Sequence, residues 1–361
     1  MIILEIFLGL LILVFLVVAH ELGHALQAHR SGVVVEEFGI GLPPKAWGKK
    51  LKNGLMFTIN WLPIGGFVKL QGEYDSANKK GDYGAVSFWK KTKILLAGVA
   101  INWLIAAILL SCLALTGLPK IISNQFSIPG DTTIVSQPVE IVSLTKDHAA
   151  EKSGFKVGDK ILRFAGQEVP NADKMIELSK ANAGKEVPII YDRSGTEYTI
   201  NVALGQENAG GVFGASLGQR ELIKSTWSAP IVGVVTSAQF TWVTIQGIGD
   251  LIAGIFHSGI GSASSSVAGP IGILGTVFPE AEKSGPTQLI FLTAIISLSL
   301  AVMNILPIPA LDGGRWFTMA LFRLFKKDLT KSREEKIQAI GFYALMILII
   351  LVTISDVAKL L

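Results

Sequence analysis

Cysteine is almost absent from this sequence, because its 361 residues contain only Cys112. A single cysteine forms no disulfide within the chain and excludes a cysteine-rich zinc site, so any metal must be held by His, Asp or Glu. Charged residues are also scarce, at 17%, and no internal repeat is visible. Aromatic and basic residues do not gather in the pattern of an RNA- or DNA-binding surface, so nucleic acid is not an expected partner.

Apolar residues make up half of the chain, and the mean hydropathy is +0.50. Since the middle third is more polar, the composition favours membrane spans combined with a soluble insert. Apolar runs long enough to cross the bilayer lie at residues 1 to about 27, 94–118, 287–306 and 337–357. The first run lacks the basic start and the cleavage site of a signal peptide, so it predicts a retained span.

The segment 229–256 is apolar but interrupted by polar residues and glycines, among them Gln239, Gln246 and Asp250. This pattern favours an amphipathic helix that lies on the membrane or in a groove. A fifth membrane span is the alternative.

Basic residues gather in the loop after the first run, as in Lys69 and Lys91, and in the loop between the last two runs, as in Arg323 and Lys327. With four spans, both loops lie on one side of the membrane, and the positive-inside rule places that side in the cytosol. Both termini and the long segment from about 119 to 286 then face outward. Five spans would place one basic loop outside.

Residues 54–70 alternate and are rich in β-branched and aromatic side chains, which predicts a hairpin of strands with a turn at Pro63, Ile64, Gly65 and Gly66. Unpaired backbone cannot face lipid, so the hairpin must be shielded by protein or enter a sheltered cavity. An unwound peptide in a dry site needs backbone partners, so we expect Ile59 or Phe67 to face such a peptide.

The outward segment at 137–204 has the pattern of a separate soluble module. Strands are expected at 139–144, 188–191 and 197–204, with a helix at 172–181. The motif Ser-Gly-Phe-Lys-Val-Gly-Asp stands at 153–159. Residues 262–273 form a flexible polar run that ends in a Gly-Pro turn, and no chemical role follows from it.

The sharpest chemical signal is the sequence His20-Glu21-Leu22-Gly23-His24. Two histidines four residues apart project from one face of a helix, about 6 Å apart along its axis. Their imidazoles can share one zinc ion, and Glu21 can take the proton of the water that the metal activates. Such ionisable residues at the end of a membrane span indicate a functional site by default.

A hydrolytic zinc site needs a third protein ligand and leaves the fourth position open. Asp312 is the candidate, because it follows an apolar helix broken by Pro307 and Pro309 and precedes two glycines. The alternative for Asp312 is an ordinary helix-ending turn. Asp250 is a rival ligand, and Asp328 is a poorer one because it lies in a charged loop.

Two amides, Asn102 and Asn304, lie in the predicted spans. They either hold helices together, at about 0.6 kcal/mol on average, or hydrogen-bond the substrate backbone and steady a developing oxyanion.

These motifs resemble those of the site-2 protease family of intramembrane zinc metalloproteases, and within it the bacterial regulator-of-sigma-E protease branch. The resemblance covers nearly the whole chain: residues 20–24 match the zinc helix, residues 304–313 match Asn-x-x-Pro-x-Pro-x-Leu-Asp-Gly, and Gly98 with Asn102 matches the Gly-x-x-x-Asn element of the second span. The hairpin resembles the membrane-dipping β-loop that holds substrate as a strand. The motif at 154–159 resembles a bacterial PDZ domain, present once here where the best-known members of the branch carry two.

The resemblance implies a polytopic α-helical membrane protein with about four transmembrane helices, a membrane-associated β-hairpin and an inserted α+β PDZ domain. We expect a first membrane part at 1–118, an extracytoplasmic PDZ domain at 119–224, an amphipathic segment at 225–286 and a second membrane part at 287–361. His20, His24 and Asp312 would bind Zn²⁺, Glu21 would be catalytic, and the substrate would contact Asn304, Asn102, Ile59, Pro63, Gly65, Gly66 and Phe67.

The implied activity is regulated intramembrane proteolysis of single-span membrane proteins, such as anti-sigma factors or remnant signal peptides, in the bacterial cytoplasmic membrane. The active-site motifs would lie toward the cytosol, and the PDZ groove outside would bind a peptide or C-terminus. A metal transporter would need polar residues along a path and often repeated halves, and neither is visible. A non-catalytic PDZ receptor would not need Glu21 between the histidines.

Overall fold

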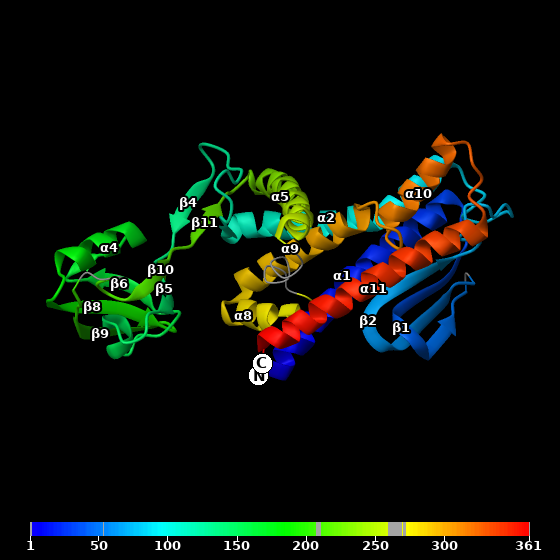
Figure 1. Ribbon diagram of the computed structural model, residues 1–361. Helices are drawn as coiled ribbons and strands as arrows, with labels where there is room; N and C mark the ends of the chain where they lie inside the picture. Colours follow the sequence, from blue (N-terminus) through cyan, green and yellow to red (C-terminus); the bar gives the residue numbers. More distant parts are fainter. Residues whose placement is uncertain (1, 53, 207–210, 259–268, 270–271, 361) are drawn as a thin grey trace. The chain divides into compact units, whose positions relative to one another are not determined.

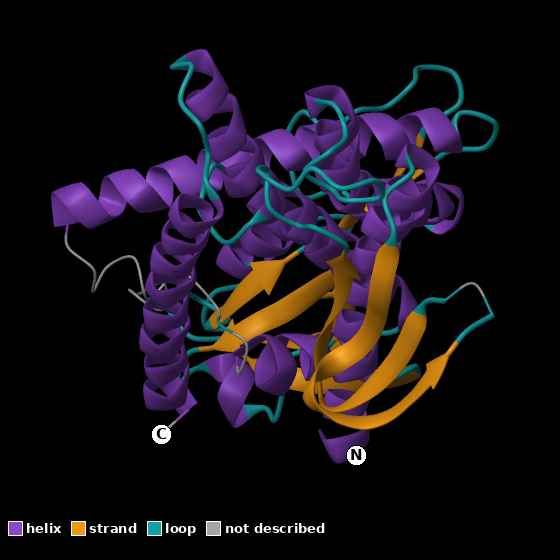
Figure 2. Cartoon of the chain, turned by 90° about the vertical axis from the view of Figure 1, so that its right-hand side faces the viewer, coloured by secondary structure: helices purple, strands orange, loops and turns teal. Residues whose placement is uncertain are grey.

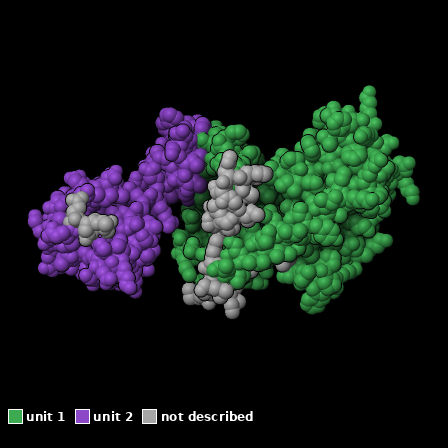
Figure 3. Space-filling model, viewed as in Figure 1, with its two compact units in different colours: residues 1–113, 230–361 green, residues 114–229 purple. Residues whose placement is uncertain are grey.

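The computed structural model describes residues 2–52, 54–206, 211–258, 269 and 272–360. The chain forms two compact units (Figure 3). Unit 1 combines Met1–Leu113 with Pro230–Leu361, and unit 2 consists of Ala114–Ala229. Most of the run at 262–273, including its serines, lies outside the described residues.

Long apolar helices form the frame of unit 1 (Figure 1). Within the described residues, five helices are long and apolar enough to cross a membrane: α1 (Ile2–Ser31), α2 (Phe88–Thr116), α5 (Ala229–Ser258), α9 (Pro286–Ile305) and α11 (Lys331–Leu360). A helix satisfies its own backbone hydrogen bonds, which is the requirement for a segment that crosses lipid. The four predicted runs fall in α1, α2, α9 and α11. Because α5 meets the same criteria, a count of four spans is not confirmed.

Three shorter helical elements are also present among the described residues of unit 1. The π-helix η1 (Ile273–Val277) and α8 (Phe278–Lys283) precede α9. The amphipathic helix α10 (Asp312–Leu324) follows α9 after the Pro307–Pro309 break. Thus α10 starts at the residue predicted as the third metal ligand.

The hairpin consists of two long antiparallel strands, β1 (Val35–Lys50) and β2 (Met56–Leu70), which curve strongly in Figure 2. Both strands bend near the middle, so one part of β1 has partners on both sides: Gly39 pairs with Phe67 and also with Thr58. The pairing gives four adjacent strand segments, in the order 66–70, 35–40, 56–60 and 45–50. The segments 66–70 and 45–50 are therefore the edges of this small sheet.

The prediction that residues 54–70 form a two-stranded hairpin with a turn at 63–66 is wrong. Met56–Leu70 is a single strand, β2, which includes residues 63–66, and its partner β1 was not predicted. The change of direction is made inside the strand, where Gly65 has a φ of 83° that favours glycine. A local bend with register shifts replaces the two-strand turn that the Pro-Ile-Gly-Gly sequence predicts.

The described residues of unit 2 form two antiparallel sheets and two short helices, α3 (Ala149–Lys152) and α4 (Ala172–Ala181). The larger sheet has the order β10-β5-β6-β8-β9, with β7 paired to β6, and the smaller has the order β3-β11-β4. Their strands are β3 (Leu118–Pro119), β4 (Thr133–Ser136), β5 (Val139–Leu144), β6 (Lys160–Phe164), β7 (Gln167–Glu168), β8 (Glu186–Arg193), β9 (Thr196–Ala203), β10 (Ala215–Gly218) and β11 (Glu221–Lys224).

The core of unit 2 is a closed apolar cluster on the larger sheet, which includes Phe155, Phe164, Met175, Ile189 and Phe213. The predicted strands at 139–144, 188–191 and 197–204 and the helix at 172–181 are confirmed. The short strands β4, β6, β10 and β11 were not predicted, because their few residues show little alternation.

Candidate active site

The helix α1 positions His20 and His24 one turn apart, and both side chains are buried. Their Nε2 atoms lie 3.0 Å from each other. The Nδ1 of His24 lies 2.8 Å from the carbonyl oxygen of Ile94 on α2. Because a carbonyl oxygen only accepts, Nδ1 carries the proton and donates it, and the Nε2 of neutral His24 keeps its lone pair for a metal.

The start of α10 brings Asp312 to the same point. Its Oδ2 atom lies 3.0 Å from the Nε2 of His20 and 3.2 Å from the Nε2 of His24. The two glycines that follow allow this approach: a Cβ on Gly313 would lie 2.1 Å from the carbonyl oxygen of Ile305. Burial alone would raise the pKa of the Asp312 carboxyl, but hydrogen bonds to His20 and His24 hold this pKa below its ordinary value. The carboxylate is therefore anionic.

These three side chains have the geometry of zinc ligands. At zinc–ligand bonds of about 2.0–2.1 Å, two ligand atoms of a tetrahedral ion are about 3.3 Å apart. The observed separations are 3.0, 3.0 and 3.2 Å. In the described part of the chain, His20, His24 and Asp312 are the group of His, Cys, Asp or Glu residues whose ligand atoms converge in this way.

Gly98 of α2 keeps the space for the ion open. A Cβ at this position would lie 2.6 Å from the Nε2 of His24 and 2.7 Å from that of His20. A Cβ on Gly23 of α1 would lie 2.7 Å from the carbonyl oxygen of Ala97, so α1 and α2 are also in close contact here. The donor set and the space that a Cβ would fill both fit Zn²⁺ with an open fourth position.

Glu21 lies beside the metal ligands and contacts the hairpin. Its carboxylate faces the backbone N–H of Val68 in β2. A Cβ on Gly66 would lie 3.7 Å from the Cγ of Glu21. The proposed general base is thus adjacent to the edge segment 66–70.

The outer edge of this segment follows a simple alternation. The amides of Val68 and Leu70 are both directed away from β1, the first to Glu21 and the second to the carboxylate of Glu73 at 2.7 Å. Residues two apart in a strand present their backbone to the same edge. Gly66 therefore presents its backbone to the edge that faces α1.

The other predicted hairpin residues are arranged differently. Ile59 lies in the segment 56–60, which has partners on both sides, Ile40 and Trp47. Phe67 pairs with Gly39 and covers it, since a Cβ there would meet its ring at 2.3 Å. The exposed Pro63 lies at the bend of β2. Among these residues, Gly65 and Gly66 are placed against α1, near Val17 and Val18.

The two predicted amides differ in their surroundings. Asn304 on α9 donates to the carbonyl oxygen of Leu300 at 3.0 Å, so it is used within its own helix. Asn102 on α2 is fully buried, and neither its Oδ1 nor its Nδ2 atom has a hydrogen-bond partner among the described residues. The rival ligands Asp250 and Asp328 are exposed and do not belong to the converging group.

Val68 and Ile94 were not predicted, and no role was assigned to Gly98. The first two act through their backbone, which leaves no trace in the side-chain pattern. Gly98 offered a signal, since it stands within an otherwise bulky apolar helix, where a glycine usually has a packing or functional reason.

This fold and this site define a membrane-embedded zinc hydrolase. The sequence matches Peptidase family M50 over residues 8–348. The chain therefore belongs to the M50, or site-2 protease, family and is a multi-pass membrane zinc metalloendopeptidase.

Curated relatives are similar over nearly the whole chain. A putative zinc metalloprotease of Fusobacterium nucleatum is 31% identical, covering 98% of this chain and 97% of that protein. The zinc metalloprotease RasP of Geobacillus kaustophilus is 27% identical, covering 95% of each chain. The regulator of sigma-W protease RasP of Bacillus subtilis is 25% identical, covering 96% of each.

Among solved structures, the PDZ domain of an SdrC-like protein from Listeria monocytogenes is 19% identical and covers 26% of this chain and 93% of that one. Its TM-score of 0.21 is too low to establish a shared fold.

Proposed function

We propose that this protein performs regulated intramembrane proteolysis and cuts single-span membrane proteins, such as anti-sigma factors or remnant signal peptides. One observation carries the proposal: three ligand atoms, two from the apolar helix α1 and one from the start of α10, converge within 3.0–3.2 Å of one another, next to a glutamate that lies beside a sheet edge. A metal, a base and a strand partner are the parts that hydrolysis of an unwound helix requires.

In this mechanism, His20, His24 and Asp312 hold Zn²⁺. The ion, when bound, supplies Lewis-acid polarisation of the scissile carbonyl and makes the attacking water more acidic. Glu21 accepts the proton of that water as the C–O bond forms, and it delivers the proton to the leaving amine as the peptide C–N bond breaks. The backbone N–H of Val68, which faces the Glu21 carboxylate, helps to orient it for both transfers.

The substrate is held as a strand along the edge 66–70. A transmembrane helix hides its carbonyls in its own hydrogen bonds, so it must unwind before it is cut. Gly66 offers backbone groups on the edge next to Glu21, and pairing there compensates for the broken helical bonds. The unpartnered amide of Asn102 and the amide of Asn304 position the peptide further.

The two edges of the hairpin sheet supply a matched test of this strand pairing. Single cysteines at Lys69 and at Lys49, in a Cys112→Ser background, lie on opposite edges. With a cysteine in the substrate span, a disulfide should form with the Lys69→Cys variant and not with the Lys49→Cys variant. Equal cross-linking at both edges would contradict pairing along 66–70.

The active-site end of unit 1 faces the cytosol of a bacterial cell, and the metal centre lies at the cytosolic side of its cytoplasmic membrane. The contacts favour four crossings. Gly9 near the start of α1 adjoins Phe278, and Asp356 near the end of α11 accepts hydrogen bonds from Gly269 and Gly272. The chain thus approaches α9 at the end of the bundle opposite to the metal ligands.

The helix α5 starts at that same end. A Cβ on Gly233 would contact Ser111, near the end of α2. Since the chain starts α5 and enters α9 at one end, residues 229–286 contribute no net crossing. A cysteine at Lys327 should be protected from an impermeant thiol reagent in intact cells, whereas one at Lys174 should react, and the reverse pattern would overturn this orientation.

Unit 2 acts outside as a PDZ module that admits substrates whose outer domains have been trimmed and binds an extended peptide or a C-terminus. The motif at 154–159 and a sheet with open edges at β9 and β10 support this role. Deletion of the outer domain of a substrate should then accelerate its cleavage by the parent protein. Equal cleavage of long and trimmed substrates would remove this role.

Glu21→Gln is the decisive test of the proposed reaction. The variant keeps all three metal ligands and removes the base, so it should bind one zinc and lose cleavage. His20→Ala should lose both. A Glu21→Gln variant that still cuts a single-span substrate would refute the mechanism, and one that carries zinc across a membrane would indicate a transporter.

A further inference from the structure

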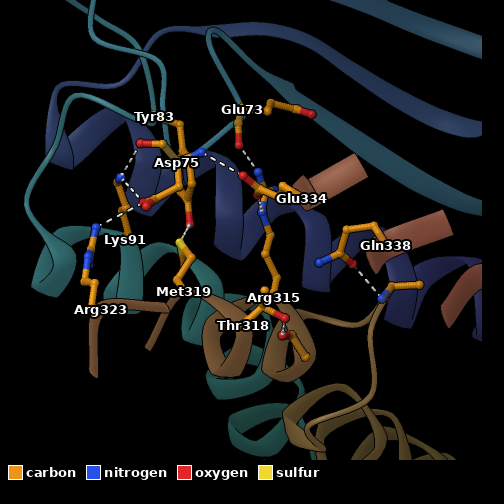
Figure 4. Close-up of polar contacts among 12 residues, drawn as sticks. Glu73, Asp75, Tyr83, Lys91, Arg315, Thr318, Met319, Arg323, Glu334 and Gln338 are labelled. Atoms are coloured by element: carbon orange, nitrogen blue, oxygen red, sulfur yellow. Dashed lines mark hydrogen bonds and ion pairs between the residues drawn. The ribbon is translucent and has the colours of Figure 1, made fainter. Parts of the chain in front are cut away.

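A cluster of charged residues in unit 1 does not include the three proposed metal ligands (Figure 4). It joins the loop after β2 to three helices: Asp75 of the loop, Lys91 of α2, Arg315 and Arg323 of α10, and Glu334 of α11. The side chains of Lys91 and Glu334 are 1% and 3% exposed. Buried charges are costly unless they are paired, so we expect this cluster to have a structural or functional role.

One branch of the cluster reaches Asp312. The guanidinium of Arg315, one turn after Asp312 in α10, donates from Nε to Glu334 at 3.2 Å and from Nη2 to the carbonyl oxygen of Glu73. It also lies over the ring of Tyr83, 4.8 Å from the ring centre. Thus Arg315 attaches the helix that carries one metal ligand to the residues that follow the edge strand.

The other branch reaches His24. The carboxylate of Asp75 accepts an ion-paired hydrogen bond from Lys91, and its backbone N–H donates to Glu334 at 2.8 Å. Lys91 stands one turn before Ile94, whose carbonyl oxygen orients His24. The loop at 73–75 is therefore connected to metal ligands on two separate helices.

A cavity confirms that the cluster adjoins the metal centre. It has a volume of about 360 Å³, and its walls include Asp312, Arg315, Glu73 and Glu334. The same loop begins directly after the segment 66–70, where Glu73 accepts the N–H of Leu70. Metal ligand, charged cluster and substrate edge are thus parts of one connected structure.

We propose that Lys91, Asp75, Glu334 and Arg315 form an ionic clamp that positions Asp312 against His24 and thereby sets the affinity and geometry of the zinc site. These four are positioning residues, because none of them contacts the metal position or the scissile bond. The proposal rests on the function proposed above, in which Asp312 is a zinc ligand.

The proposal predicts which neighbouring residues affect the zinc affinity and which do not. Arg323 also binds Asp75, at 3.0 Å, but its side chain is 38% exposed and it lies at the far end of α10. It lies about three turns from Asp312, and its loss leaves Asp75 paired with Lys91, so Arg323→Gln is a matched control. Trp316 donates to Thr92 at 3.0 Å and joins α10 to α2 independently, which helps clamp variants to fold.

The test compares full-length Arg315→Lys and Lys91→Met with Arg323→Gln in detergent. Zinc affinity is measured by competition with a chelator, ligand geometry by the absorption spectrum of the cobalt-substituted protein, and folding by thermal unfolding of the metal-free protein. Loss of residues that orient metal ligands typically weakens binding by about 10–100-fold. We expect this loss and an altered cobalt spectrum in both clamp variants, with parental behaviour in Arg323→Gln.

Parental zinc affinity and a parental cobalt spectrum in both clamp variants would overturn the proposal. If either variant fails to fold, Glu334→Gln replaces it, since it removes the charge opposite Arg315 without changing size, and retained affinity there has the same meaning. Asp312→Ala separates the test of the zinc-ligand assignment from the test of the clamp. Zinc retained in Asp312→Ala refutes the ligand assignment, whereas zinc lost there but kept in the clamp variants refutes the clamp alone.

Discussion

The two units bury opposite kinds of side chain. In unit 2, aromatic and aliphatic residues such as Phe155 and Phe164 are buried, and the ion pair of Lys174 and Glu177 is at the surface. In unit 1, Phe15 of α1 is 59% exposed, while Lys91 is fully buried. The difference shows that the two units fold in different solvents: unit 2 in water, and the long helices of unit 1 in lipid.

A lipid environment also changes how much a buried charged side chain contributes to the specificity of helix packing. In water, the apolar core supplies most of the specificity of packing, as in unit 2. Lipid-facing helices gain little from contact with one another through apolar groups alone, because lipid tails are as apolar as leucine. The metal ligands and the ionic clamp therefore provide contacts between helices of unit 1 that apolar side chains cannot specify.

The largest effect should come from the proposed metal ligands His20, His24 and Asp312, which belong to unit 1. His20→Ala removes one of three ligands, so zinc content should fall close to zero and cleavage of a single-span substrate by at least about 10³-fold. Zinc content and cleavage are measured on the same purified preparation. The core of unit 2 contains no metal ligand, so its thermal unfolding should stay parental, and a loss of unit 2 would break the separation of the two units.

Truncation of a phenylalanine should then distinguish a core from a lipid-facing surface. Phe164 of unit 2 is 0% exposed, so Phe164→Ala should cost about 3–5 kcal/mol through the lost contacts and the cavity left behind. Phe15→Ala in α1 leaves no protein cavity and should cost less than about 1 kcal/mol. Denaturant unfolding in detergent measures both, and equal costs would show that Phe15 is covered by protein.

A charged residue introduced at two equally exposed positions, one in each unit, tests whether the two units face different solvents. Ile347 of α11 and Val157 of unit 2 are 60% and 63% exposed. Arginine at the centre of a membrane span costs about 2.5–3.5 kcal/mol, whereas a surface substitution in water changes stability by about 0.5 kcal/mol or less. Ile347→Arg should therefore reduce the membrane-inserted amount of protein while Val157→Arg does not. If both variants insert normally, α11 does not face lipid at residue 347.

The sequence was sufficient to predict that His20, His24 and Asp312 come together, because they stand in short motifs with a fixed chemical meaning, and their role as zinc ligands stays a prediction. His20 and His24 are on one turn of one helix, and Asp312 is marked by its break of prolines and glycines. The strand structure of residues 56–70 was predictable from their alternation, but the partner strand β1 was not predicted. The bend of the two strands was not predictable either, because Gly39 pairs on both sides through contacts that no local pattern specifies.

The ionic clamp was not predictable, because its members are far apart in the chain: Asp75 and Glu334 are separated by 259 residues. Lys91 and Arg323 had another interpretation, as part of the basic loops that set membrane orientation. The structure shows that both also form ion pairs with Asp75. A basic residue at the end of a span can thus serve topology and packing together, and the sequence pattern reveals only the first.

The smallest effect concerns a partly exposed charge of unit 2, the carboxylate of Asp131. Its carboxylate accepts hydrogen bonds from the hydroxyls and the backbone N–H groups of Ser228 and Thr226, just before α5. The hydroxyl of Ser228, followed by that of Thr226, lowers the pKa of Asp131 from 3.8 to about 2. Because the folded pKa is depressed, the stabilisation is fully present above about pH 4 and is lost as the pH falls through about 2.

Asp131→Asn removes the charge and keeps one oxygen acceptor, so the effect should be local. Amide protection of residues 226–228, measured by hydrogen exchange at pH 7 and corrected for intrinsic rates, should decrease, while the core strands β6 and β8 stay protected. Toward pH 2 the parent protein should approach the protection of the variant, because its own carboxylate becomes neutral. If the parent and Asp131→Asn show equal protection at pH 7, the charge contributes nothing there, in contrast to the buried charges of unit 1.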